Sequence, residues 1–238
     1  MNLFTKPLSL KFAKLTAFSI AAASTLLLNS CSKDPDPVQD VSFLAITNAS
    51  PTLASYNVYI GANQANRSGA LGFGSNVAYA QCAVGSNSVK FTTTSNTESV
   101  ITKAVNVEAN TANSLFLIGK AGQLDYLVLK DQLGSVSSDK TFIRFINLSP
   151  DAPALDLAVK DGNTLIADKA YKASSSFTEF EAKTYVLVVK DKATGTTLKR
   201  ELASTEFKAG RSYTIIAAGL VAPANTEQAF TTQIITNQ

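Results

Sequence analysis

The second half of the chain alternates apolar and polar residues over short segments that are rich in β-branched side chains. A period of two residues is typical of strands with one face on a core and the other toward solvent. Turn signals that contain glycine, such as residues 161–163 and 193–195, separate the segments. The pattern predicts no helix after the N-terminal leader and seven strands, at residues 142–147, 154–160, 177–181, 184–190, 196–202, 211–218 and 230–236.

The first half of the chain repeats this pattern. Phe43-Leu-Ala-Ile-Thr-Asn-Ala-Ser-Pro51 matches Phe142-Ile-Arg-Phe-Ile-Asn-Leu-Ser-Pro150 at an offset of 99 residues, and residues 114–118 align with 212–216 at an offset near 98. Two copies of one fold explain the match. Seven short strands in roughly a hundred residues suit an immunoglobulin-like β-sandwich. Since self-similar copies imply separate cores, residues 141–238 are expected to fold without the first copy.

The N-terminus has the parts of a secretory signal. A basic segment with three lysines precedes the apolar residues 15–28, which at 14 residues are too few for a membrane-spanning helix of about 20. Leu28-Asn-Ser-Cys31 then resembles the lipobox of bacterial lipoproteins, in which the cysteine thiol is acylated and the residue becomes the mature N-terminus. The alternative is an ordinary secreted protein with a coincidental cysteine.

These boundaries give a complete predicted organisation for the chain. The all-β class is predicted as two tandem immunoglobulin-like β-sandwich domains after a lipoprotein signal peptide and a short polar tether. The predicted parts are a signal peptide at 1–30, a lipidated cysteine and tether at 31–40, a first sandwich at 41–133, a linker at 134–140 and a second sandwich at 141–238.

The composition excludes several classes of function. Three of the 21 basic residues and none of the 18 acidic residues lie in the leader, so the rest of the chain has 18 of each and lacks the basic excess of nucleic-acid-binding proteins. The absence of histidine removes the Ser-His-Asp triad and nearly all zinc sites. With Cys31 acylated, Cys82 has no disulfide partner and is expected to be buried and inert. We therefore predict no metal, no cofactor, no nucleic-acid partner and no enzymatic activity.

The opening strand of the second copy carries a resemblance to a known family. Residues 142–157 and 209–219 resemble the opening and late strands of an uncharacterised bacterial domain family that begins V-R-F-x-N-x-S-P-D-A-P-x-V-D-V. The first copy keeps Asn48-Ala-Ser-Pro51 but departs from the motif after it. The resemblance implies an immunoglobulin-like sandwich in an exported, often tandem, lipoprotein, and it implies no function. Tyr213 resembles a tyrosine whose hydroxyl bonds back to a turn.

Two pairs of side chains are candidates for binding a ligand. Asp151 and Asp156 offer carboxylate oxygens for calcium or a sugar, although both also suit structural roles in a turn and on an outward strand face. Asn57 and Tyr59 are expected to point outward from one strand, as an amide beside an aromatic ring. The alternative for Tyr59 is packing under the glycine-rich residues 69–75.

A carboxylate pair in the second copy is not expected to be catalytic. Glu179 and Glu181 share one strand face, whereas a glycosidase needs two carboxylates facing each other across a cleft.

Together these patterns predict a non-enzymatic cell-envelope lipoprotein held by its lipid at the outer membrane, periplasmic or surface-exposed. It would act as a binding module or a spacer, with a glycan or a protein as ligand. The second hypothesis is a glycan-binding accessory lipoprotein of a polysaccharide uptake or adhesion system. The third is an enzyme that uses only carboxylates or serines.

Overall fold

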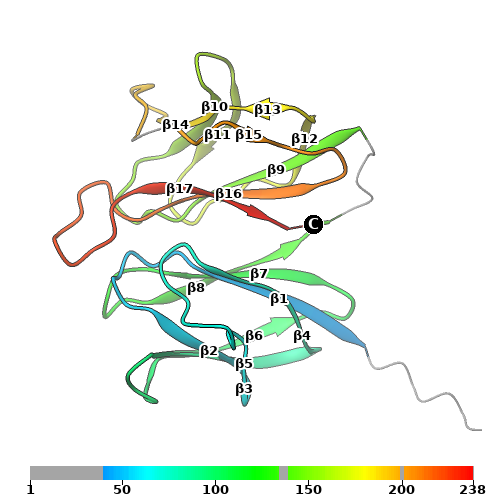
Figure 1. Ribbon diagram of the computed structural model, residues 1–238, viewed down its shortest axis with the longest axis vertical. Helices are drawn as coiled ribbons and strands as arrows, with labels where there is room; N and C mark the ends of the chain where they lie inside the picture. The colour runs from blue at the N-terminus through cyan, green and yellow to red at the C-terminus, as the bar shows by residue number, and fades with distance from the viewer. Residues whose placement is uncertain (1–39, 134–138, 199–200, 238) are drawn as a thin grey trace, which may run out of the picture. The chain divides into compact units, whose positions relative to one another are not determined.

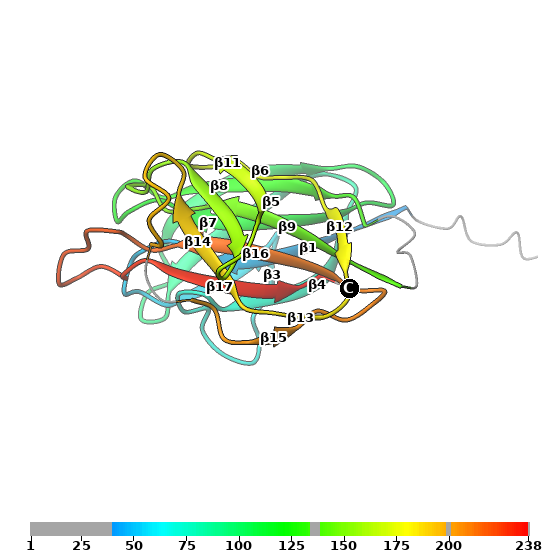
Figure 2. The ribbon, with the colours of Figure 1, turned by 90° about the horizontal axis from the view of Figure 1, so that it is seen from above.

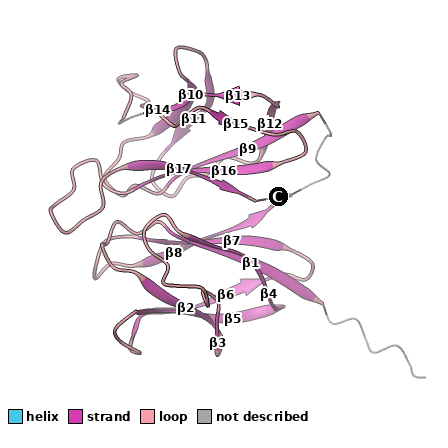
Figure 3. Ribbon diagram, viewed as in Figure 1, coloured by secondary structure: helices cyan, strands magenta, loops and turns pink. Residues whose placement is uncertain are grey.

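The computed structural model describes residues 40–133, 139–198 and 201–237, and every regular element in them is a β-strand (Figures 1 and 3). This confirms the all-β class and the sandwich arrangement. Cys31, the signal peptide and most of the tether lie outside the described residues. We call residues 40–133 the first copy and residues 139–237 the second copy.

The first copy is built from two four-stranded sheets. Apolar side chains from both sheets, among them Leu44, Val58, Phe91 and Leu115, are fully buried between them. One sheet has the order β4 (Asn76–Ala83), β1 (Val41–Asn48), β7 (Ala112–Ile118) and β8 (Asp125–Asp131). The other has the order β3 (Asn63–Gln64), β2 (Tyr56–Ile60), β5 (Gly85–Thr93) and β6 (Ser99–Val107).

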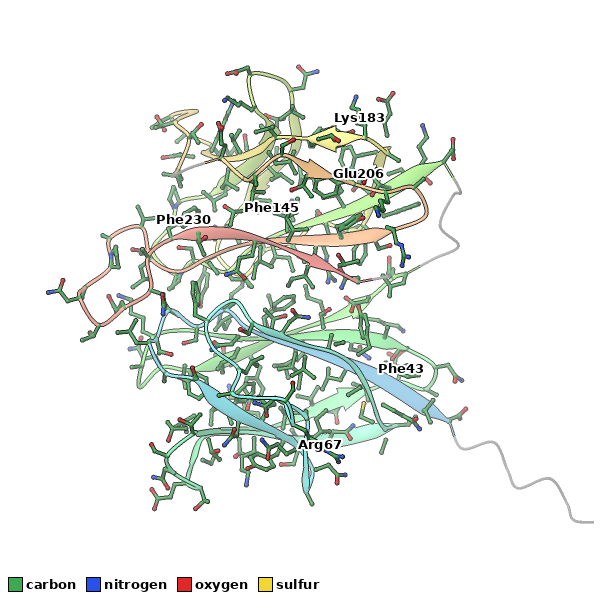
Figure 4. The ribbon with its side chains drawn as sticks, in the orientation of Figure 1. Phe43, Arg67, Phe145, Lys183, Glu206 and Phe230 are labelled. Carbon is green, nitrogen blue, oxygen red and sulfur yellow. The ribbon has the colours of Figure 1, made fainter. Side chains whose placement is uncertain are left out.

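The second copy repeats this design with smaller facing sheets (Figure 2). Phe145 and Phe230, both labelled in Figure 4, belong to its core with Leu157 and Ile215. One sheet has the order β12 (Thr178–Glu181), β9 (Lys140–Asn147), β16 (Ser212–Ala218) and β17 (Thr231–Thr236). The facing strands are β11 (Thr164–Lys169), β10 (Leu155–Val159) and β14 (Leu187–Asp191), with the pair β13 (Thr184–Tyr185) and β15 (Thr205–Glu206).

Three sequence predictions in the second copy were wrong in detail. In the described part of residues 196–202 the backbone bonds to β14 without forming a regular strand. Thr197 bridges Lys190, and the N–H groups of Leu198 and Leu202 donate to the Val189 and Leu187 carbonyls at 2.8 and 2.9 Å. Strand β11 was missed because its pairing with β10 is irregular, which breaks the alternation that marks a strand. The late strands correspond at an offset of 100 residues and not 98, since Phe43 pairs with Ala112 where Phe142 pairs with Ser212.

The Asn-x-Ser-Pro motif closes the same corner in both copies. The side-chain oxygen of Asn48 accepts a hydrogen bond from the Ser50 backbone at 3.1 Å, and Asn147 does the same for Ser149 at 3.1 Å. The serine hydroxyls donate to the carbonyls of Gly119 and Gly219, each at 2.7 Å. The motif therefore ties the end of the opening strand to the end of the late strand.

The two glycines that receive these bonds have a left-handed backbone. Gly119 has a φ of 86° and Gly219 a φ of 82°. A Cβ on Gly219 would lie 2.2 Å from the Ala229 carbonyl oxygen, and one on Gly119 would lie 2.2 Å from the Gln123 carbonyl oxygen. Only glycine fits both constraints.

A third apolar cluster joins the two copies. The outer face of the β4-β1-β7-β8 sheet meets the outer face of the β12-β9-β16-β17 sheet, and all seven residues of β16 are buried. Strands buried on both faces read as continuous apolar runs. The buried members are Ala49, Phe116 and Ile118 from the first copy and Ile146, Leu148, Ile216 and Ala218 from the second. Independent folding of residues 141–238 remains a prediction, and that fragment would expose its share of this cluster.

Replacing Gly219 by alanine tests the glycine corner. Gly219→Ala is expected to lower the free energy of unfolding by about 3 kcal/mol or more, because backbone strain and a clash with the Ala229 carbonyl add. Gly210 is the matched control, since it has a φ of +71° and no atom within 4 Å of an added Cβ. Gly210→Ala should cost about 1–2 kcal/mol from backbone strain alone. Urea denaturation measures both, and equal losses would contradict the corner geometry.

Candidate functional site

The four predicted ligand residues lie in two separate places. Asn57 and Tyr59 belong to β2 in the first copy, whereas Asp151 precedes β10 and Asp156 lies within it in the second copy. The structure therefore divides them into an amide–aromatic face and an acidic corner.

Tyr59 lies on the half-buried outer face of β2, beside amide and amine groups of the neighbouring strands. It pairs with Gln64 on one side and with Lys90 on the other. The Lys90 ammonium nitrogen lies 4.5 Å from the centre of the Tyr59 ring, a cation–π contact. The Gln64 amide donates to the Asn57 side-chain oxygen at 3.4 Å. A sugar that stacks on this side of the ring would have to displace the lysine.

The glycine-rich residues 69–75 are held by Tyr56. Leu71 exchanges two backbone hydrogen bonds with Tyr56, at 2.8 and 3.2 Å, and both residues are buried. The Tyr56 hydroxyl lies 2.8 Å from the Thr52 hydroxyl, and its ring meets Phe91 edge-on. The buried tyrosine of this strand is thus Tyr56, and Tyr59 remains available at the surface.

Asp151 fixes a loop of its own copy against the opening corner. Its two carboxylate oxygens accept backbone hydrogen bonds from Val221 at 2.9 Å and Ala222 at 3.0 Å, and the Ser149 hydroxyl oxygen lies 3.2 Å from one of them. Partial burial raises the pKa of this carboxyl, but the N–H bonds from Ala222 and Val221 outweigh burial and hold the pKa below its usual value. Asp151 therefore works as a charged clamp on the loop after β16.

That loop reaches the first copy. The Gln228 backbone donates to the Pro51 carbonyl at 2.7 Å, and Lys120 forms an ion pair with Glu227 at 3.2 Å. Asp151 thereby acts indirectly on the contact between the copies.

Asp156 is engaged within its own sheet. Its carboxylate accepts the backbone N–H of Asp168 at 2.7 Å, and Asp168 has a left-handed backbone with a φ of 61°. Within the described residues, no group of three or more Cys, Asp or Glu side chains is placed to hold a metal ion. Asp151 and Asp156 are thus separate backbone anchors in this structure.

A groove of mixed polar and apolar lining, which the sequence did not indicate, opens along the edge of the first copy. Its volume is about 1020 Å³. The short edge strand β3, the edge strand β4 and the start of β5 line it. Since β4 belongs to one sheet and β3 and β5 to the other, the groove lies at the edge of the sandwich, between its two sheets. Asp40, which directly precedes β1, forms part of its rim.

The groove wall combines small apolar residues with neutral hydrogen-bonding groups. The side chains of Asn63, Gln81, Ser86 and Ser88 line it, and in the described part of the chain none of the four has an intramolecular hydrogen-bond partner. Arg67, labelled in Figure 4, donates its Nε–H to the Gln64 carbonyl at 3.3 Å. The groove therefore offers amides, hydroxyls and one cation to a ligand.

Sequence reasoning missed the groove because its wall combines residues from three segments. A usable signal was present in β4, where Gln81 interrupts a run of small apolar residues on an exposed edge. Gln64, whose amide bonds to Asn57, also lines the groove and so joins it to the amide–aromatic face.

Other sequence-based expectations can be checked directly. The Tyr213 hydroxyl accepts the Lys208 backbone N–H at 3.2 Å, which confirms its turn-bonding role. Cys82 is buried, also as predicted, and burial raises the pKa of its thiol. Glu181 is paired with Lys183 at 2.7 Å on an exposed strand, and this pairing lowers the pKa of Glu181. No helix in residues 40–133, 139–198 or 201–237 is long and apolar enough to cross a membrane.

Comparisons with known proteins give a match to one family model and indicate no activity. No curated protein matches the chain significantly. Among solved structures, the chain is similar to a family-26 carbohydrate-binding module, CBMbc of Eubacterium rectale Amy13K in complex with maltoheptaose, at 7% identity and a TM-score of 0.25. That match covers 83% of this chain and 97% of the other, and at this TM-score it carries no argument about fold or ligand.

The family match begins at the first strand and extends beyond the first copy. It ends within β10, so it includes the opening motif of the second copy. Residues 42–158 match the model of the family described as Domain of unknown function (DUF4397), which confirms the resemblance to an uncharacterised domain family.

Proposed function

We propose that this protein is a non-enzymatic, lipid-anchored module of the cell envelope that binds a ligand in the groove of its first copy. The observation that carries the binding role is the groove of about 1020 Å³, in which four neutral polar side chains have no hydrogen-bond partner among the residues that the structure describes. Unpaired donors and acceptors that converge on a concave surface are what a polar ligand requires.

The lipid anchor is supported by the N-terminal sequence. A basic segment, a short apolar stretch and Leu28-Asn-Ser-Cys31 occur in the order of a lipoprotein signal. Acylation at Cys31 would hold the protein at the outer membrane, facing the periplasm or the cell surface. Eight residues lie between Cys31 and Asp40 at the groove rim, and the nine Cα-to-Cα steps that join the two span at most about 32 Å when extended. A ligand in the groove would therefore be held close to the membrane.

The chemistry of the groove favours a hydroxyl-rich, neutral ligand. One arginine and one aspartate balance each other among the charged groups of its wall. The remaining polar groups are amides and hydroxyls, which donate and accept hydrogen bonds as sugar hydroxyls do. A glycan is the ligand class that matches this wall, and the adjacent Asn57–Tyr59 face would extend the site. A role in glycan uptake or adhesion would follow from such binding.

The absence of histidine supports a non-enzymatic role, because histidine is the commonest general acid and base. The carboxylates of Asp151 and Asp156 bind backbone N–H groups of their own copy. This arrangement leaves them as structural anchors and favours binding over catalysis.

The first prediction concerns the anchor. Cys31→Ala is expected to abolish incorporation of radiolabelled palmitate and to leave the precursor unprocessed, because lipobox cleavage requires the modified thiol. Cys82→Ala is the matched control, since it removes the other cysteine and should retain the label. Labelling of Cys31→Ala at the level of the native protein would refute the lipid anchor.

The second prediction concerns the groove. On an array of neutral and acidic oligosaccharides, the protein should retain neutral glycans, and Gln81→Ala or Asn63→Ala should weaken binding roughly 2- to 10-fold, the value of one neutral hydrogen bond. Asn163→Ala, in the exposed turn between β10 and β11, is the matched control and should bind as the native protein does. Retention of acidic glycans only, or equal binding by all variants, would contradict a neutral-glycan groove.

The third prediction separates the two tyrosines of β2. Tyr59→Ala should lower the free energy of unfolding by about 1 kcal/mol, because the ring is half-buried and loses mainly its contact with Lys90. Tyr56→Ala should cost about 3–5 kcal/mol, because its ring is 2% exposed and packs on Phe91. Chemical denaturation measures both. A loss of glycan retention by folded Tyr59→Ala would extend the site to this face, and unchanged retention would exclude Tyr59.

A further inference from the structure

The contact between the two copies has a buried polar centre inside its apolar cluster. The guanidinium of Arg144 in β9 donates to a carboxylate oxygen of Asp131 in β8 at 2.6 Å. The two side chains are 3% and 0% exposed. An ion pair removed from water to this extent is maintained only when its remaining hydrogen-bonding groups are also satisfied.

Side chains from both copies satisfy that pair. Arg144 donates to the Thr214 hydroxyl at 2.9 and 3.1 Å and to the Ser114 hydroxyl at 3.3 Å. The other oxygen of Asp131 accepts from Ser114 at 2.7 Å and from Tyr79 at 2.6 Å. Burial, and next the charge of Asp131, raises the pKa of Tyr79 to about 12, so its hydroxyl stays protonated and donates.

The residues of this centre are equivalent positions of the two copies. In the strand registers, Ala45 pairs with Ser114 as Arg144 pairs with Thr214. The same registers place Asp131 opposite Ala112, as they place Asn237 opposite Ser212. Tyr79 directly precedes Ala80, which pairs with Leu44. Phe177 directly precedes Thr178, which pairs with Ile143, the equivalent of Leu44 in the second copy. Each copy thus contributes one patch: Ala45, Tyr79, Ser114 and Asp131 from the first, and Arg144, Phe177, Thr214 and Asn237 from the second.

The two patches contact each other. Asn237 of the second patch donates to the Tyr79 hydroxyl of the first at 3.0 Å, and Arg144 of the second donates to Asp131 of the first at 2.6 Å. A surface that meets its own equivalent is the arrangement of a two-fold homodimer, here within one chain.

Charge breaks the symmetry of the patches. The first patch carries one acid, Asp131, and has Ala45 where the second has Arg144. The second patch carries one base and has Asn237 where the first has Asp131. Pairing two first patches would bury two carboxylates without a base, and pairing two second patches would bury two guanidinium groups without an acid. Buried charges without a partner are strongly unfavourable.

We propose that each patch is a domain-pairing surface that selects its partner by charge. The partner that it binds is the oppositely charged patch of another domain of the same kind. In this chain the partner is the other copy. The Asp131–Arg144 pair makes the chain close on itself and rejects association between like copies of different chains. This inference is independent of the ligand and of the lipid anchor.

Charge exchange in the full chain tests the code. Asp131→Arg and Arg144→Asp each place like charges at the centre and should lower the melting temperature by about 6–20 °C. The double variant restores an opposite pair and should recover more than half of the summed loss. Lys120→Glu is the control, because it places like charges at the exposed Lys120–Glu227 contact between the copies and should shift melting by less than about 4 °C.

Mixing the two single variants provides a second, independent readout. When Asp131→Arg and Arg144→Asp chains are refolded together, both patches of one chain are basic and both patches of the other are acidic. Each patch therefore finds an opposite charge on the other chain and none within its own chain. A one-to-one dimer should therefore form in the mixture and in neither variant alone, as measured by size exclusion with light scattering. This holds even where the separate variants do not fold. Losses that add in the double variant, together with no dimer in the mixture, would overturn the proposal.

Discussion

The structure depends on the need to bury the central strands of each copy on both faces. Strands β7, β9 and β16 place apolar side chains in the core of their own copy and also in the cluster between the copies. A single sandwich covers only one face of such a sheet, and the second face would leave large apolar side chains such as Phe116 in water. The packing of the copies follows from this surplus of apolar surface, and it confines the accessible features to the outer sheets and the edges.

The sequence predicts the all-β fold class and the two repeats, but it does not predict how the two copies pack against each other. Alternation and turn residues were sufficient for β-strands, and the Asn-x-Ser-Pro match located the equivalent corners. The same period of two residues suggests a solvated outer face, so Phe142-Ile-Arg-Phe-Ile-Asn147 reads as an ordinary strand with an exposed arginine. Arg144 is instead buried, because its charge partner, Asp131, lies across the copy boundary. Local pattern carries no information on such long-range pairs.

The candidate site was less predictable for a related reason. Asp151 and Asp156 attract attention as carboxylates, yet backbone N–H groups bind both, which single-residue chemistry does not reveal. The groove depends on how β3 and β4 end at the sandwich edge, and that geometry is set by register and not by composition. The Asn-x-Ser-Pro motif that carries the family resemblance has the same structural role in both copies, whereas positions such as Tyr59 and Ala158 differ between them.

The parallel pairing of β1 with β7 also has a mechanical consequence. Strand β1 begins directly after Asp40 and lies between β4 and β7. A force applied at Asp40 along the strand would load all of its hydrogen bonds to both neighbours at once, in shear, and would not peel them apart one at a time. Withdrawal of β1 would also strip residues such as Leu44 from the core and Ala49 from the contact between the copies. The fold is therefore built to resist traction through the end at which the chain enters it.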